Sequence, residues 1–276
     1  MHDSATPALR LQIWKVVVSY DGTDFRGWQV QPGLPTVQGE LQAALGRITG
    51  ETPLPQGSGR TDAGVHALGQ VASFALAAPI PPQNLQRALN RTLPASIRVL
   101  KAKMVPSSFH ARHSAVAKTY EYRVLPAAAD HCSPFLARYV YACPWQLNRV
   151  ALDAAAAHLL GEHDFASFAA TDPDLATREA DAEAEALSTV RTVFASAWEE
   201  QASTGGPLLI YRVRGNGFLH HMVRNLVGTM VEVGRGFLTA EAIPAILAAR
   251  ARSAAGPTAP ARGLFLQSVE YGGRDE

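Results

Sequence analysis

A glycine-rich loop carries the residues of this sequence that are best suited to chemistry. Residues 57–69 contain four glycines and no proline, and they include Arg60 and Asp62. Glycine tolerates a positive φ and lets another backbone approach closely, and loops on rigid scaffolds often hold catalytic groups. An ionised carboxylate can attack carbon and form a covalent intermediate, and Arg60 could keep Asp62 ionised or hold an anionic substrate. The alternative is that Asp62 is a turn residue, which is ordinary chemistry for Thr-Asp-Ala-Gly.

The elements around this loop predict an α+β fold. Apolar, β-branched runs predict strands at 11–19, 71–76, 97–104, 118–125, 190–201, 208–214 and 264–271. Helical spacing of apolar residues predicts helices at 37–48, 83–91, 148–160, 218–233 and 240–251. Thr36 is the expected N-cap of the first helix, and Gly50 is its expected end. The similar order of elements in the two halves of the chain favours two related α/β half-domains.

The order of elements also predicts the domain boundaries. We expect a loose tail at residues 1–10, an N-terminal half at 11–109 that carries the loop, and a C-terminal half at 110–276. The C-terminal half contains an acidic, alanine-rich insert at 171–186. Because acidic side chains repel phosphate, we expect this insert to point away from any RNA or to be disordered.

Composition and charge narrow the class of protein. The chain has 276 residues, 47% of them hydrophobic, so it can bury a full core. It has no apolar run near the ~20 residues that span a bilayer and no signal-peptide pattern, so we expect a cytoplasmic protein without a membrane partner. Cys132 and Cys143 are expected to be inert thiols in a reducing compartment.

The distribution of charge permits an RNA partner. The net charge is only +1, but outside residues 172–185 there are 24 basic residues and 18 acidic ones. Only four of the basic residues are lysines, and the arginines that make up the rest suit phosphate and stack on bases. A basic balance of this size allows nucleic-acid binding without demonstrating it.

Several motifs in this order resemble the tRNA pseudouridine synthase A family. The loop reads Gly59-Arg-Thr-Asp-Ala-Gly-Val-His-Ala67, which looks like the active-site motif of that family. The other motifs are Tyr20-Asp-Gly-Thr-Asp-Phe-Arg-Gly-Trp-Gln-Val-Gln31, Thr36-Val-Gln38, Ala88-Leu-Asn90 with Leu93-Pro94, Phe109-His-Ala-Arg112, Lys118-Thr-Tyr-Glu-Tyr-Arg123, His163-Asp-Phe-Ala-Ser-Phe168, Phe218-Leu-His-His-Met-Val-Arg-Asn-Leu-Val-Gly228 and Gly263-Leu-Phe-Leu266 with Val269-Glu-Tyr271. A single such motif is weak, but this set covers roughly residues 11–272 and is specific.

The resemblance implies a fold and a reaction. The family fold is two α/β halves joined through a continuous, mainly antiparallel sheet, with helices on one face and a central active-site cleft. The reaction is the isomerisation of uridine to pseudouridine in the anticodon stem-loop of tRNA, at positions 38, 39 and 40. It needs neither a metal nor another cofactor, and the family is usually a homodimer.

The resemblance also assigns roles to four residues. Asp62 matches the nucleophile, and the residues do not decide whether it attacks C1′ or C6. Tyr120 matches the tyrosine that stacks on the substrate base, with Tyr122 as a competitor on the same face of its strand. Arg60 matches an arginine that helps to extrude the target base, and Arg224 matches one that pairs with the catalytic carboxylate.

Three other functions are compatible with parts of the sequence. A non-catalytic RNA-binding protein would explain the charge but not Arg60, Asp62 and Arg224 together. A glycosidase would need a second carboxylate near Asp62, and an aspartyl phosphotransferase would need a Mg²⁺ site. The histidine pairs His110/His113 and His220/His221 lack the further ligands of a metal site, so we expect them to contact RNA or to make structural hydrogen bonds. His66, within the loop, is expected to order it.

Overall fold

The computed structural model describes residues 11–127, 132–171, 188–203 and 206–272. The predicted tail at 1–10 lies outside these ranges, and so does the acidic insert apart from its first residue. The chain forms two compact units, one of residues 1–115 and 269–276 and the other of residues 116–268. We predicted a boundary between residues 109 and 110, and it stays a prediction because compact packing and independent folding are different properties.

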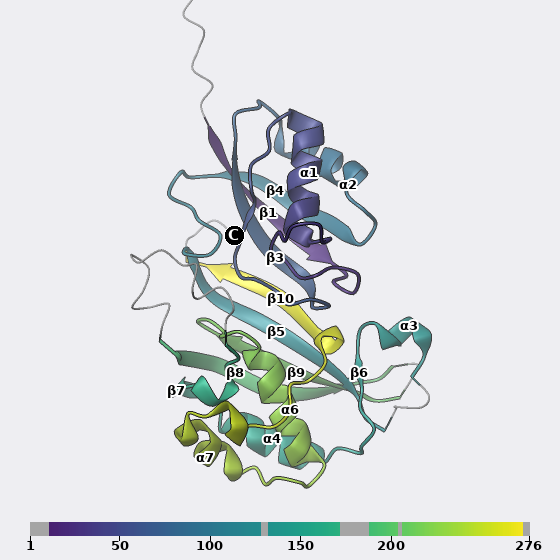
Figure 1. Cartoon of the computed structure of the whole chain (residues 1–276), viewed down its shortest axis with the longest axis vertical. Helices are drawn as coiled ribbons and strands as arrows, with labels where there is room; N and C mark the ends of the chain where they lie inside the picture. The colour runs from purple at the N-terminus through teal and green to yellow at the C-terminus, as the bar shows by residue number, and fades with distance from the viewer. Residues whose placement is uncertain (1–10, 128–131, 172–187, 204–205, 273–276) are drawn as a thin grey trace, which may run out of the picture. The chain divides into compact units, whose positions relative to one another are not determined.

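The first unit is a small antiparallel sheet with two helices. Its elements are β1 (Gln12–Tyr20), α1 (Val37–Thr49), β2 (Gln56–Gly57), β3 (His66–Leu76), α2 (Pro82–Thr92) and β4 (Ile97–Val105). Strand β1 pairs with β3 on one side and with β4 on the other, and β4 is an edge strand. Helices α1 and α2 pack together beside these strands (Figure 1).

Alternation along β1 explains which face the helices cover. Its even-numbered residues Trp14, Val16, Val18 and Tyr20 are buried, whereas the odd-numbered residues from Ile13 to Ser19 are only partly buried. Successive side chains of a strand point to opposite faces, so the even-numbered residues form the core. The prediction for α1 is confirmed at both ends, since the Thr36 side chain accepts a hydrogen bond from the backbone N–H of Gly39 and Gly50 ends the helix with φ 75°.

The second unit carries the remaining elements. They are β5 (Ala115–Leu125), α3 (Pro134–Ala137), β6 (Tyr141–Ala142), α4 (Arg149–Ala157), β7 (Gly161–Asp164), β8 (Val190–Gln201), β9 (Leu208–Gly215), α6 (Met222–Gly234), α7 (Ala242–Ala249) and β10 (Leu264–Tyr271). Strands β5, β9, β8 and β7 are antiparallel neighbours, and β6 is parallel to β5. Strand β10 belongs to the second unit as far as residue 268 and to the first from residue 269. The predicted α+β class with mainly antiparallel strands is confirmed.

Several predicted element boundaries are wrong: the strand predicted from residue 118 begins at Ala115, the helix predicted to residue 160 ends at Ala157, and the helix predicted at 240–251 spans Ala242–Ala249. The helix predicted from residue 218 begins at Met222, because His221 has φ 60° and therefore cannot be a residue of a right-handed helix. The strand predicted from residue 71 begins at His66, because the register of β3 with β1 continues back to Ala67 opposite Tyr20. None of the helices in the described part has the length and apolarity that crossing a bilayer requires.

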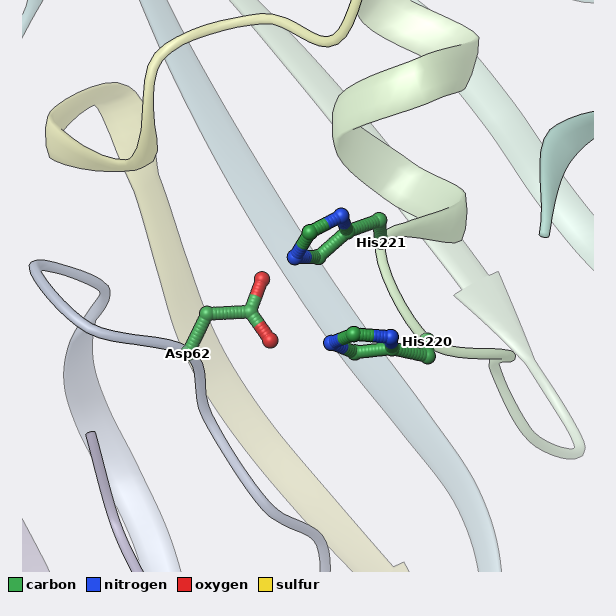
Figure 2. A group of neighbouring side chains, drawn as sticks. All are labelled: Asp62, His220 and His221. Carbon is green, nitrogen blue, oxygen red and sulfur yellow. The ribbon is translucent and has the colours of Figure 1, made fainter. Parts of the chain in front are cut away.

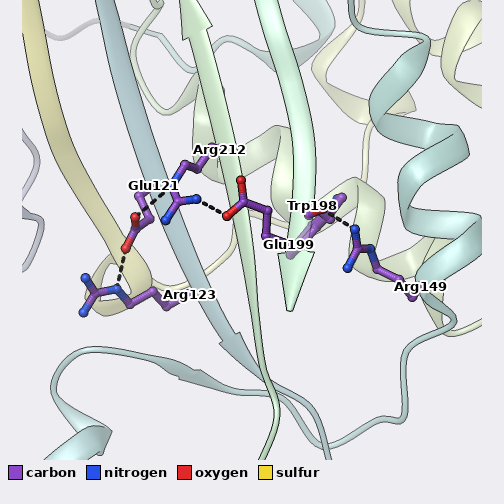
Figure 3. Close-up of polar contacts among 6 residues, drawn as sticks. All are labelled: Glu121, Arg123, Arg149, Trp198, Glu199 and Arg212. Atoms are coloured by element: carbon purple, nitrogen blue, oxygen red, sulfur yellow. Dashed lines mark hydrogen bonds and ion pairs between the residues drawn. The ribbon is translucent and has the colours of Figure 1, made fainter. Parts of the chain in front are cut away.

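Strand β5 contains a buried carboxylate, Glu121, that is paired with two arginines. Glu121 is 4% exposed, and its carboxylate accepts hydrogen bonds from Arg123 at 2.7 Å and from Arg212 at 3.2 Å (Figure 3). Arg212 is also paired with Glu199 on β8. A buried carboxylate is tolerated when it is paired and hydrogen-bonded, so the two arginines allow Glu121 to occupy the sheet.

Candidate active site

The loop that carries Asp62 connects β2 to β3 and is fixed at its first residues by a buried glutamine. Gln70 on β3 is fully buried, and its side-chain amide donates to the Gly59 carbonyl at 2.8 Å. Its side-chain oxygen accepts from the Ser58 hydroxyl at 2.7 Å. Because buried polar groups need partners, these bonds hold the beginning of the loop in one conformation.

The motif from Tyr20 to Gln31, which we call the N-terminal motif, packs directly against the same loop. The Tyr20 hydroxyl is 2.8 Å from the Thr61 hydroxyl, and the backbone N–H of Trp28 donates to the Thr61 carbonyl at 3.0 Å. Burial raises the pKa of Tyr20 to about 12, so its hydroxyl keeps its proton at neutral pH. Two motifs that are about forty residues apart in the sequence are thus one structural assembly.

Glycines in the N-terminal motif allow this close packing. A Cβ at Gly22 would lie 1.9 Å from the Val65 carbonyl oxygen. Gly27 has φ 94°, and a Cβ there would lie 2.6 Å from the Thr61 carbonyl oxygen. Because a side chain at either position would push the loop away, these two glycines set the position of the backbone on both sides of Asp62.

Asp62 and Arg60 have different exposures within the loop. Asp62 is half-buried between the buried residues Thr61 and Val65, and its carbonyl accepts from the Val65 N–H at 3.1 Å. Its carboxylate extends from the loop (Figure 2). Arg60 is exposed. The two residues lie on one loop as the sequence predicts, with the carboxylate on a braced backbone and the arginine at the surface.

His66 has the structural role that we expected. It is buried at the start of β3, and its Nδ1 accepts a hydrogen bond from the Gly22 N–H at 3.1 Å. The same nitrogen is 3.2 Å from a carboxylate oxygen of Asp21. His66 therefore ties the end of the loop to the turn after β1.

In the second unit, the structure separates the two tyrosines of β5. Tyr122 is fully buried, and its hydroxyl donates to the Pro260 carbonyl at 2.7 Å. Tyr120 is 8% exposed and packs edge-to-face on Phe218, with ring centroids 5.0 Å apart. Because Tyr122 has no exposed surface and its hydroxyl is bonded, Tyr120 is the better candidate for contact with a ligand.

Arg224 is the one residue of α6 that is not buried. Its Nε donates to the Ala259 carbonyl at 2.8 Å, and the Ala259 N–H donates to the Arg224 carbonyl at 3.1 Å. Burial raises the pKa of Tyr122 well above its usual value, and the charge of Arg224 opposes that rise. Residues 256–260 form a segment beside α6 that we call the strap. The helix and the strap therefore hold this arginine.

The two histidine pairs make hydrogen bonds to backbone groups. His220 and His221 come just before α6 (Figure 2), with their rings 4.0 Å apart, and a ring nitrogen of His220 is 3.0 Å from the Thr171 carbonyl. Nδ1 of His110 accepts from the backbone N–H groups of Arg112 and His113. Burial, with smaller effects of the His113 and Arg112 charges, lowers the pKa of His110. The expectation that these pairs do not bind metal stays a prediction.

The four predicted site residues divide equally between the units. Arg60 and Asp62 share a loop in the first unit, and Tyr120 and Arg224 belong to β5 and α6 of the second. The sequence did not point to the residues that support them, namely Tyr20, Gln70, Phe218, Asn225 and the strap of residues 256–260. A polar residue in an apolar helix, such as Asn225, was the signal that could have been used. Its side chain bonds to Phe168, Arg252 and Thr258.

Comparison with known proteins places this chain among the enzymes that modify tRNA. The model of a family described as tRNA pseudouridine synthase matches residues 16–114 and 155–272, which is more than half of the chain. The chain therefore belongs to the tRNA pseudouridine synthase family and is an isomerase of uridine in tRNA. The matched segments include Arg60, Asp62 and Arg224, while Tyr120 lies between them.

Full-length relatives support the same family. A protein of Solibacter usitatus named tRNA pseudouridine synthase A is 49% identical over 258 residues, which cover 93% of this chain and 98% of the relative. Proteins with the same name from Moorella thermoacetica and Bacillus pumilus are 48% and 45% identical, each over 93% of this chain and 98% of the relative. The family prediction is confirmed.

Proposed function

We propose that this chain converts uridine to pseudouridine in the anticodon stem-loop of tRNA, at positions 38, 39 and 40, with Asp62 as the nucleophile. The observation that carries the proposal is the bracing of the loop, since Thr61 and Val65 are buried on either side of a half-buried Asp62. A nucleophile acts efficiently when its backbone is held in the productive geometry. A turn residue would not require two glycines and a buried tyrosine to fix its neighbours.

The proposed reaction is balanced without a redox step. The bond between N1 of uracil and C1′ breaks, a bond between C5 and C1′ forms, C5 loses a proton and N1 gains one. The Asp62 carboxylate attacks either C1′ or C6, and the covalent bond is broken again before release. No atom or electron is gained overall, so the chemistry requires only positioned acids and bases.

The other three residues have supporting roles in this proposal. Tyr120 stacks on the target base, which contributes roughly 1–3 kcal/mol and offsets the few kcal/mol that extrusion of a base costs. Arg60, at the surface of the loop, contacts the RNA from which the base is extruded. In this proposal Arg224, whose Nε donates to the Ala259 carbonyl, pairs with the carboxylate of the nucleophile, as the resemblance to the family implies.

The assembly and location are also part of the proposal. The active species is a homodimer in the cytoplasm, where tRNA is the substrate and where the free thiols Cys132 and Cys143 stay reduced. Sedimentation of the pure protein tests the dimer. A monomer at the concentrations that support turnover would contradict it.

The experiment measures pseudouridine in tRNA transcripts after incubation with wild-type protein, Asp62→Asn or Asp153→Asn. The last variant makes the same chemical change on the exposed surface of α4. We expect product from wild type and Asp153→Asn, and at least a ~10³-fold loss of rate for Asp62→Asn. Transcripts with cytidine at position 38, 39 or 40 assign the sites. Tight binding without product from any protein would instead indicate a non-catalytic RNA-binding protein, and turnover by Asp62→Asn would remove the aspartate from its role.

A further inference from the structure

A buried asparagine interrupts the apolar surface of α6. Asn225 is fully buried, and the residues that follow it, Leu226 and Val227, are buried and apolar. Its side-chain nitrogen donates to the Phe168 carbonyl at 2.7 Å. Its side-chain oxygen accepts hydrogen bonds from two residues that precede β10 in the chain. Burying a polar side chain costs free energy unless it is hydrogen-bonded, so these bonds make the burial of Asn225 possible.

Arg252 and Thr258 supply the two donors to that oxygen. Nη2 of Arg252 donates to the Asn225 side-chain oxygen at 3.1 Å and to the Thr258 hydroxyl at 3.0 Å. The Thr258 hydroxyl donates to the same Asn225 oxygen at 2.6 Å. We name Asn225, Arg252 and Thr258 the polar cluster. Because each member bonds to the other two, a displacement of one disturbs the bonds of both others.

The polar cluster fixes a segment that has no regular secondary structure of its own. The strap, residues 256–260, forms neither helix nor strand, so its backbone groups need partners from elsewhere. Nη1 of Arg252 donates to the carbonyls of Ala255 and Gly256, at 3.3 Å and 2.9 Å. The strap is therefore held at its first residue by Arg252 and at Thr258 by the whole cluster.

The residue after Thr258 contacts Arg224. The Ala259 carbonyl accepts from Arg224 Nε at 2.8 Å, and the Ala259 N–H donates to the Arg224 carbonyl at 3.1 Å. The peptide bond between Thr258 and Ala259 is planar, so a fixed Thr258 leaves the Ala259 N–H little freedom to turn. The polar cluster thus lies one residue from the backbone groups that orient Arg224.

Stability alone is a weak explanation for this cluster. Replacing buried polar partners by apolar groups of the same shape can be nearly neutral or stabilising, and most of the buried residues of α6 are already apolar. A satisfied polar network adds one defined arrangement of its members. A side chain that takes part in catalysis requires such a defined arrangement.

We propose that Asn225, Arg252 and Thr258 are positioning residues that act through Arg224. This inference rests on the proposed function, in which Arg224 pairs with the carboxylate of the nucleophile. The strap holds Nε of Arg224, and because a guanidinium is planar, its two terminal nitrogens then point in set directions. Loosening the strap lets the guanidinium turn, which lowers kcat and leaves the affinity for tRNA unchanged.

The test measures pseudouridine formation at saturating and at limiting tRNA by wild type, Thr258→Val, Thr258→Ser and Thr189→Val. Valine keeps the branched shape of threonine and removes its hydroxyl, whereas serine keeps the hydroxyl. Thr189 is a matched control because it is half-buried like Thr258 and its hydroxyl donates to the Asp164 carboxylate. We expect Thr258→Val to lower kcat by roughly 10- to 100-fold, the loss that a small displacement causes, with KM unchanged. Thr258→Ser and the control should keep the kcat of wild type.

A second variant and a double mutant make the result specific. Arg252→Lys keeps the charge but replaces the forked nitrogens by a single one, so it should lower kcat in the same way. Because the cluster acts through Arg224, Thr258→Val should cause no further loss in an Arg224→Gln protein. An equal loss in both backgrounds, or a kcat for Thr258→Val equal to that of Thr189→Val, would overturn the proposal.

A measurement without substrate separates this inference from the proposed function. The Nε–H signal of Arg224 in a nitrogen-edited NMR spectrum is identified by its absence from Arg224→Lys protein. Its exchange with solvent should be about tenfold faster in Thr258→Val, as expected for the loss of one hydrogen bond, and unchanged in Thr189→Val. Wild-type exchange in Thr258→Val would overturn the positioning role, whereas a wild-type protein that forms no pseudouridine would overturn the proposed function.

Discussion

Replacing Gly228 with alanine sets two opposite effects against each other within α6. In a helix interior, alanine is more favourable than glycine by about 1 kcal/mol. A Cβ at Gly228, however, would lie 1.7 Å from the carbonyl oxygen of Pro257. That oxygen belongs to backbone, so a whole segment of the strap has to move rather than one flexible side chain.

The hydrogen bonds of the strap give the size of the second effect. Movement of the strap would break two bonds between Arg224 and Ala259 and the bond from the Gly256 N–H to the Thr229 hydroxyl. Each is worth about 1 kcal/mol net, so the loss is about 3 kcal/mol. Subtracting the gain in helix propensity leaves a net destabilisation of about 2 kcal/mol, which corresponds to a fall in Tm of roughly 4–8 °C.

The assay is thermal unfolding of wild type, Gly228→Ala and the control Gly46→Ala. Gly46 lies in the interior of α1, where a new Cβ meets only the Thr52 side-chain methyl closely, at 3.1 Å. The control should therefore be as stable as wild type or more stable by up to about 1 kcal/mol. A Gly228→Ala protein that is as stable as wild type, beside a control that behaves as expected, would refute the reasoning.

Three further predictions concern the hydroxyl groups of two tyrosines and the half-buried carboxylate of Asp164. Tyr122→Phe should lower the free energy of unfolding by about 1 kcal/mol in a denaturant titration, because it leaves the Pro260 carbonyl without its partner. Tyr120→Phe should keep the stacking of the ring on the base. It should lower the rate in single-turnover kinetics only if the tyrosine hydroxyl moves a proton. The hydrogen bond from the Thr189 hydroxyl is the largest of the effects that lower the pKa of Asp164 in the folded protein. The ionised carboxylate therefore stabilises the fold at pH values above its ordinary pKa of about 3.9. This stabilisation is lost as the pH falls through the lower pKa that Asp164 has in the folded protein. Asp164→Asn should be about 1 kcal/mol less stable at pH 7, with the difference shrinking below pH 4, and equal stability at pH 7 would contradict this.

Local rules were sufficient for much of the fold. The cap at Thr36 and the stop at Gly50 depend on neighbouring residues alone, so the sequence predicts both ends of α1. The start of α6 depends on the backbone of His221, whose φ of 60° is imposed by surrounding structure. Periodicity of apolar residues cannot detect such a position, which is why the predicted helix was four residues too long at its start.

The candidate site was predictable as a set of motifs but not as a physical arrangement. The sequence identifies Asp62 as a possible nucleophile, and the resemblance assigns the stacking role to Tyr120 with Tyr122 as a competitor on the same face. The burial of Tyr122 and its bond to the Pro260 carbonyl give a physical reason to separate the two. That bond joins residues 138 apart in the chain, a separation at which residue spacing carries no information.

The contacts between the N-terminal motif and the loop of Asp62 indicate that this motif has a supporting role. In the sequence, the motif from Tyr20 to Gln31 contributes only to the resemblance to the family. The structure uses three of its residues as support, because Tyr20 bonds to Thr61, Gly27 admits the Thr61 carbonyl and Trp28 donates to it. A substitution such as Gly27→Ala should therefore impair catalysis through the position of Asp62, even though Gly27 has no group that could take part in the chemistry.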